Sequence, residues 1–164
     1  MFSKPEYSTA FRCVCSLLCL LALAVLCTPS YAARAIVNVQ QPDNEITDRA
    51  DLRAIFTLRK RQWSSGAPVK VYVLPDTNTV HDDFVKQKLH LYPYQLRQIW
   101  NRLVFSGTGV APVEVETEAE VVEAVLDNPY AIGYVNGIEL PAGVKEAPLP
   151  TGVAAELADG VSVP

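Results

Sequence analysis

Hydrophobic and polar positions along the chain follow two different periods. In some segments apolar residues run together or alternate with polar ones, which is the period-two pattern of β-strands. In the segments between them, apolar residues recur every three to four positions, as on the buried face of a helix. The pattern predicts strands over residues 35–39, 68–74 and 131–135, and an edge strand over 144–149. Their alternation with helices predicts an α/β domain with helices packed on a mixed sheet.

Four helices are expected between these strands. Their starts are marked by residues that cap or open helices, namely Thr47 or Asp48, Asn78 or Thr79, Pro93, and Thr117 with Glu120 in a capping box. Their predicted core positions are Leu52, Ile55, Phe56, Phe84, Val85, Leu89, Leu91, Leu96, Ile99, Trp100, Leu103, Val121, Val122, Val125 and Leu126. In the strand over 131–135, small Ala131 and Gly133 allow a neighbouring element to pack closely.

The first 32 residues have the three parts of a secretory signal peptide. A short lead with two basic residues precedes an apolar run over 14–26, and small residues at Ser30 and Ala32 follow. Cleavage is expected after Ala32, with Ala33 as the alternative. A membrane-spanning helix is the competing interpretation, but the apolar run has about 13 residues, fewer than the ~20 needed to cross a bilayer. We therefore expect an exported protein that does not span the membrane after cleavage.

Composition limits the chemistry and the partners expected for the chain after residue 32. All four cysteines precede Ala32, so thiol catalysis, disulfides and cysteine metal sites are excluded from the rest. Residues 33–150 are long enough for one domain with a sizeable core, and residues 151–164, rich in Ala, Gly and Val, are expected to form a loose tail. The formal net charge of −4 makes nucleic acid an unfavourable partner.

The turn between the strand over 68–74 and the next helix is the main candidate for ligand chemistry. A helix N-terminus offers unpaired amide N–H groups and a positive dipole end, so Thr77, Asn78 and Thr79 are candidate anion-binding residues. Against this, Asp76 is negative, the turn has no glycine, and no cation stands beside it in the sequence. The alternative is that Asn78 or Thr79 only caps the helix.

Other polar clusters do not predict catalysis. His81, Asp82 and Asp83 are consecutive, and consecutive helical residues point in different directions and cannot converge on one metal ion. His90 is isolated, and no segment resembles a nucleophile elbow. The segment over 106–109 (SGTG) lacks the lysine and the spacing of a phosphate-binding P-loop and is expected to be a turn. We predict no catalytic residue, no metal and no cofactor.

Three segments together resemble the phosphate-binding proteins of bacterial phosphate ABC transporters. They are ITDRADLRAIFTLRKRQWSSG (46–66), PVKVYVLPDTNTVHDDF (68–84) and EVVEAVLDNPYAIGYV (120–135). In that family they correspond to a helix leading to a Trp-containing turn, the strand entering the ligand-binding helix, and a Pro-x-Ala-Ile-Gly-Tyr-Val strand. The resemblance implies a type 2 periplasmic-binding-protein fold, here as a short member with a single lobe.

The resemblance also implies a ligand class and partners. It implies a non-enzymatic protein, exported to the periplasm, that binds phosphate or another small oxyanion, weakly or in a shared site. An ABC permease or another envelope protein is the implied partner. The family carries an arginine and a Gly-Ser-Gly-Thr-like stretch at this turn, whereas residues 74–80 have neither, and only Thr77, Asn78 and Thr79 correspond. The alternative is a ligand-free interaction or regulatory module of the cell envelope that kept the fold.

Overall fold

The computed structural model describes residues 32–43 and 45–149. The predicted signal peptide, apart from Ala32, and the predicted tail lie outside the described residues. Within the described residues, no helix combines the length and the apolar character needed to cross a membrane.

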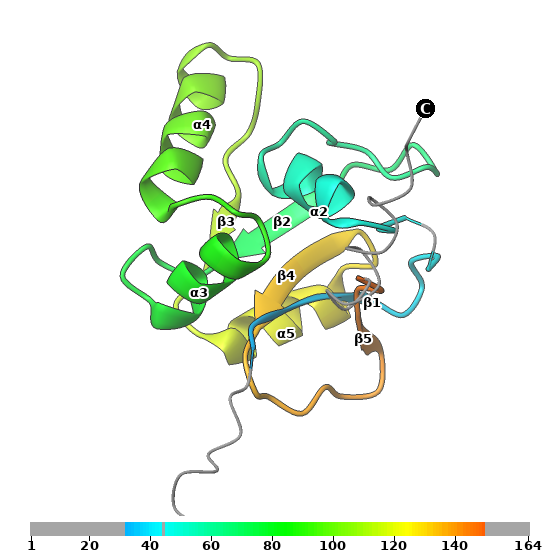
Figure 1. Cartoon of the computed structure of the whole chain (residues 1–164). Coiled ribbons are helices and arrows are strands. Elements are labelled where there is room, and N and C mark those ends of the chain that lie inside the picture. The colour runs from blue at the N-terminus through cyan, green and yellow to red at the C-terminus, as the bar shows by residue number, and fades with distance from the viewer. Residues whose placement is uncertain (1–31, 44, 150–164) are drawn as a thin grey trace, which may run out of the picture. The chain divides into compact units, whose positions relative to one another are not determined.

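Five strands and four helices make up the described part of the chain (Figure 1). In chain order they are β1 (Arg34–Asn38), α2 (Arg49–Phe56), β2 (Lys70–Val73), α3 (Thr79–Gln87), α4 (Pro93–Phe105), β3 (Val113–Glu114), α5 (Glu118–Asp127), β4 (Ala131–Val135) and β5 (Val144–Glu146). The predicted α/β class is confirmed, and each predicted helix and strand is present. The two-residue strand β3 was not predicted.

The strands form one mixed sheet in the order β3-β2-β4-β1-β5. β2 pairs in parallel with β3 on one side and with β4 on the other, whereas β1 pairs antiparallel with both β4 and β5. The carboxyl ends of β2, β3 and β4 therefore meet at the same edge of the sheet. Ligands of open α/β sheets usually bind at such an edge.

Helices cover both faces of the sheet, and two neighbouring residues of β4 show which helix lies on which face. Successive side chains of a strand point to opposite faces. Gly133 faces α5, because a Cβ at this position would come within 2.3 Å of Val121 Cγ1. The Tyr134 ring packs on the other side, stacked on Phe84 of α3 at 4.1 Å and tilted against Phe56 of α2 at 5.9 Å. The predicted close packing at Gly133 is thus confirmed.

The helices begin where their capping residues predict. Asp48 accepts a hydrogen bond from the Asp51 amide at 2.7 Å, and α4 begins at Pro93. The Thr117 hydroxyl caps α5 by accepting from the Glu120 amide at 3.2 Å. The capping box differs from the prediction in one detail, because the Glu120 carboxylate accepts from the amide of residue 116, one position before the cap.

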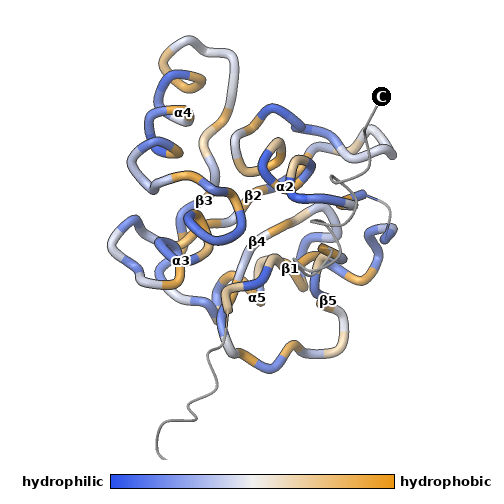
Figure 2. Tube along the Cα trace, viewed as in Figure 1, coloured by the Kyte–Doolittle hydropathy of each residue, from blue (hydrophilic) through white to orange (hydrophobic). Residues whose placement is uncertain are grey.

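The core follows the predicted pattern with few exceptions. Most predicted positions are buried, while Leu91, Ile99 and Leu103 are only partly buried. The prediction for Leu126 is wrong, because 38% of this residue is exposed. The stripe of α5 that faces the sheet is complete at Val121, Val122 and Val125, so Leu126 falls at its margin. Figure 2 shows this division along the trace, with hydrophobic stretches in β2 and β4 and hydrophilic ones in α3 and α4.

Candidate functional site

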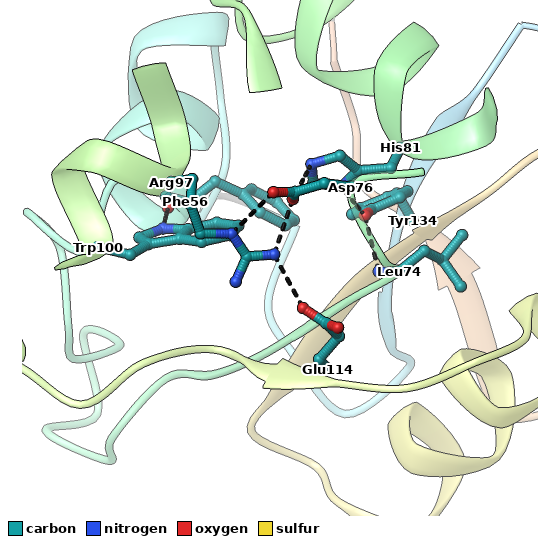
Figure 3. A network of polar contacts seen from close by, with 8 residues as sticks. All are labelled: Phe56, Leu74, Asp76, His81, Arg97, Trp100, Glu114 and Tyr134. Atoms are coloured by element: carbon teal, nitrogen blue, oxygen red, sulfur yellow. Dashed lines mark hydrogen bonds and ion pairs between the residues drawn. The ribbon is translucent and has the colours of Figure 1, made fainter. Parts of the chain in front are cut away.

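Polar side chains from four elements meet where β2 ends and α3 begins. The turn after β2 contributes Asp76, β3 contributes Glu114, β4 contributes Tyr134, and α4 contributes Arg97 (Figure 3). Glu114 lies beside the end of β2 because it pairs in register with Val73. The site therefore lies at the carboxyl ends of the parallel strands, the edge that the topology favours for a ligand.

The three residues predicted to bind an anion, Thr77, Asn78 and Thr79, lie at the start of α3 and just before it. Asn78 is the N-cap, and its Oδ1 accepts from the Val80 amide at 2.8 Å. The capping role considered for Asn78 is thus present, and it satisfies one of the free amides of the turn. Thr77 and Thr79 are exposed on either side. The amide of Thr79, an exposed residue of the same turn, has no acceptor among the described residues and remains available as a donor, whereas His81 is fully buried.

A cation does stand beside the turn, contrary to the expectation from the neighbouring sequence. Arg97 of α4 donates from Nε to Asp76 Oδ2 at 2.9 Å and from Nη2 to Asp76 Oδ1 at 2.7 Å. The same Nη2 donates to Glu114 Oε2 at 2.8 Å. The hydrogen bonds to Asp76 are the main reason why the pKa of Arg97 is raised, and the guanidinium stays charged. The guanidinium carbon Cζ of Arg97 lies 5.1 Å from the centroid of the Trp100 ring.

A buried hydrogen-bond chain lies beneath the turn. The Tyr134 hydroxyl accepts from the Leu74 amide at 2.8 Å and lies 2.5 Å from Nδ1 of His81. The Asp76 carboxylate that faces Nε2 can only accept, which favours the neutral tautomer with its hydrogen on Nε2, and the Tyr134 hydroxyl then donates its proton to Nδ1. This Nε2 is buried and has no hydrogen-bond partner among the described residues, and it faces Asp76 Oδ1 at 3.5 Å.

Burial sets the ionisation of both members of this chain. His81 and Tyr134 are fully buried. Desolvation lowers the pKa of His81 although Asp76 acts in the opposite direction, so the imidazole is neutral at neutral pH. Desolvation likewise raises the pKa of Tyr134, and the hydroxyl remains protonated. The contact between His81 and Asp76 is therefore a donor facing a carboxylate and not an ion pair.

The charged side chains of the turn compensate one another in part. Arg97 contributes one positive charge, Asp76 and Glu114 contribute two negative ones, and His81 is neutral, so the cluster has one excess negative charge. About a third to a half of each charged side chain is exposed, and solvent weakens their mutual attraction. The site thus has the donors of an anion site together with two carboxylates that already use its guanidinium.

His81 and its two neighbours do not converge. His81 points into the core, whereas Asp82 pairs with Lys86 at 2.7 Å on the outer surface of α3. The described residues contain no group of three or more His, Cys, Asp or Glu side chains placed to hold a metal ion.

A separate cavity lies away from the turn. Its volume is about 480 Å³, and it is lined by the start of β2 and by the loop over residues 107–113. The predicted turn over 106–109 forms part of one wall, and Arg61 donates a hydrogen bond to the Thr108 carbonyl. Its polar lining side chains, those of Arg61, Lys70 and Thr108, all belong to exposed residues, so the cavity offers no buried polar side chain to orient a ligand.

Arg97 and Tyr134 were missed by sequence reasoning. Arg97 lies three positions before the buried Trp100, so it flanks the buried face of α4. This spacing is the signal in the sequence that could have identified it. No local signal marks Tyr134 as a hydrogen-bond partner, because its hydroxyl bonds the Leu74 amide 60 residues earlier in the chain.

Solved structures with the same fold include proteins described as components of phosphate transport. An ABC-type phosphate transport receptor from Vibrio cholerae is 15% identical, with a TM-score of 0.55, and the match covers 73% of this chain and 46% of that one. A protein from Clostridium perfringens, solved with bound phosphate and described as a phosphate ABC transporter substrate-binding protein, is 17% identical, with a TM-score of 0.58 and coverages of 73% and 45%. The chain has the fold of phosphate ABC transporter substrate-binding proteins.

A third match agrees with these two. A protein from Planctomyces limnophilus, described as a possible phosphate-binding protein, is 14% identical, with a TM-score of 0.52, and the match covers 80% of this chain and 49% of that one. The chain thus spans about half the length of the structures that it matches. No family model and no curated protein matches the sequence. The family resemblance of the sequence is confirmed at the level of this substrate-binding-protein fold.

Proposed function

We propose that this chain is an exported, non-enzymatic protein of the periplasm that binds phosphate or another small oxyanion at the turn between β2 and α3. The observation that supports the proposal most directly is the Arg97 guanidinium, which lies at the N-terminus of α3 within hydrogen-bond distance of an oxyanion-like group, the Asp76 carboxylate. The shared fold with proteins named for phosphate transport supports the choice of phosphate.

The donors of the turn suit a tetrahedral oxyanion. A guanidinium presents parallel N–H groups that match the spacing of two oxygens in a carboxylate or a phosphate. The free amide of Thr79 and the exposed hydroxyls of Thr77 and Thr79 add donors at this turn. The dipole of α3 adds a positive potential at this end of the helix.

Binding at this turn alone is expected to be weak. The charged groups are partly exposed, and water competes for each hydrogen bond. Asp76 and Glu114 also repel an approaching anion. A second wall would exclude water and strengthen the same contacts. We propose that a second copy, an ABC permease or another envelope protein supplies such a wall, so that the site is shared.

A thermal melt of the purified protein tests this proposal. Millimolar phosphate is compared with sulfate and chloride at matched ionic strength. Ligand at about 100 times its Kd stabilises the native state by about 2.7 kcal/mol, which raises Tm by several degrees. Arg97→Gln and the double variant Thr77→Ala/Thr79→Ala should each lose the rise. Arg102→Gln, an exposed arginine on the same helix, should keep it.

Location is tested separately. Cell fractionation and the intact mass of the purified protein should show a periplasmic chain that begins at Ala33, or at Arg34 if cleavage follows Ala33. A chain that retains Met1 and stays in the cytoplasm would contradict the proposed export.

The second candidate function is a ligand-free interaction or regulatory module of the cell envelope. Two observations favour it. Arg97 is already bonded to two carboxylates, and two large apolar side chains are exposed, Phe105 (87%) at the last position of α4 and Val110 (86%) in the loop that follows. A phosphate-selective rise in Tm decides for the first candidate. The absence of any such rise, together with loss of envelope association in a Phe105→Ser variant, decides for this one.

A further inference from the structure

The Asp76 carboxylate lies at the point where the donors of the turn converge. It accepts two hydrogen bonds from Arg97, and the Nε2 of His81 faces the same carboxylate from the buried side (Figure 3). Asp76 also lies two residues before Asn78, the N-cap of α3, at the end of the helix whose dipole favours a negative group. Three independent features thus point at one carboxylate.

His81 shows that this arrangement is incomplete. Its side chain is fully buried, its Nδ1 is used by Tyr134, and its Nε2 hydrogen has no hydrogen-bond acceptor among the described residues. A buried donor without an acceptor is destabilising, and native structures rarely keep one. At 3.5 Å the Asp76 oxygen is close to Nε2 but does not satisfy it. An oxygen atom slightly nearer to His81 would do so.

The contact between Arg97 and Asp76 has the form of an arginine that holds an oxyanion. Nε and Nη2 each donate to a different oxygen of the same carboxylate, which is the bidentate geometry common to carboxylate and phosphate recognition. The difference is that this anion belongs to the chain. The Asp76 side chain is 38% exposed, so solvent is available to it if it leaves the guanidinium.

We propose that Asp76 is a tethered occupant of the anion site, and that an external oxyanion binds Arg97 and His81 only by displacing it. Glu114 holds Arg97 at the turn during the exchange, because its own hydrogen bond to Nη2 does not involve Asp76. The inference rests on the proposed function, since it assumes that the external ligand is an oxyanion at this turn. It adds that the protein regulates the site through its own carboxylate.

Removal of the carboxylate tests the proposal. Asp76→Ala is compared with the wild type in thermal melts and in calorimetric titrations with two probes, inorganic phosphate and acetate. In chloride, Asp76→Ala should have a lower Tm than the wild type, and either anion should raise its Tm again. It should also bind phosphate at least tenfold more tightly than the wild type does. Adding Arg97→Gln to the variant should remove this gain.

Asp82→Ala is the matched control. Asp82 is also an aspartate near the start of α3 and also accepts a hydrogen bond at 2.7 Å, from Lys86, but it lies on the outer surface of the helix. Its removal should not create anion-dependent recovery. Asp76→Asn is a second variant that keeps the shape of the side chain, in case the alanine variant does not fold.

The outcomes separate this inference from the proposed function. Binding in the wild type together with weaker binding in Asp76→Ala overturns the inference and leaves the proposed function, because Asp76 then contributes to ligand binding. If the wild type does not respond and anions restore the Tm of Asp76→Ala, the inference is supported and phosphate binding by the unmodified protein is excluded. No response in either protein overturns both.

Discussion

The hydroxyl of Tyr134 is expected to stabilise the native turn strongly. It accepts from the Leu74 amide at 2.8 Å and contacts His81 Nδ1 at 2.5 Å, and all three residues are buried. Tyr134→Phe removes this hydroxyl and keeps the ring, so the stack on Phe84 at 4.1 Å is retained. The substitution therefore isolates the contribution of one oxygen atom and its proton.

The magnitude follows from the groups that lose a partner. Tyr134→Phe leaves a buried amide donor at Leu74 and a buried acceptor at His81, and each unsatisfied group costs about 1–3 kcal/mol. The expected total is about 2–6 kcal/mol, a large share of the ~5–15 kcal/mol that typically stabilises a domain. Urea unfolding measures it as a lower midpoint with an unchanged m value.

Tyr72→Phe is the matched control. Tyr72 lies on β2 and is partly buried, and its hydroxyl has no hydrogen-bond partner among the described residues, so its removal should change stability by less than about 0.5 kcal/mol. A cycle that combines Tyr134→Phe with His81→Phe should give a coupling energy of about 0.5–3 kcal/mol. If Tyr134→Phe costs no more than the control, the buried chain does not stabilise the turn and the reasoning is refuted.

Three further predictions concern packing, capping and pH. Gly133→Ala should lower the free energy of unfolding in urea by about 1–3 kcal/mol, because the new Cβ would lie 2.3 Å from Val121 Cγ1. If this variant loses no stability, α5 can move away from the sheet. Asn78→Ala should cost about 1 kcal/mol through the lost helix cap, whereas Thr79→Ala should cost much less. Burial lowers the pKa of His81 from its usual 6.5, so the unfolded chain takes up a proton that the native protein does not. Stability present above pH 6.5 should therefore fall as the pH decreases, by at most about 1.4 kcal/mol per unit, and urea midpoints of His81→Phe should lose this slope.

The fold was largely predictable because its signals are local. Apolar periodicity identifies a strand or a helix within one segment, and the side chains of Asp48, Asn78 and Thr117 cap helices a few residues away. β3 is the exception. It has two residues, Val113 and Glu114, and both are exposed, so only its pairing with β2 makes it a strand.

The candidate site was predictable only in its position. The polar turn after β2 marks the start of α3, but the partners that define its chemistry come from distant segments. Arg97 lies 21 residues after Asp76, and the Tyr134 hydroxyl bonds an amide 60 residues away in the chain. The absence of a neighbouring cation in the sequence therefore did not imply its absence in space. Packing of α4 beside α3 supplies the cation.

A tethered carboxylate also predicts which anions the protein can distinguish. A group joined to its site by a short flexible connection has an effective concentration in the millimolar range, so an external anion must bind better than the tethered one to replace it. Acetate offers the same two oxygens as Asp76 and has no advantage over it. Phosphate offers further oxygens, one of which can accept from the buried Nε2 of His81 that Asp76 leaves unsatisfied. The wild type should therefore respond to phosphate and not to acetate, whereas Asp76→Ala should respond to both.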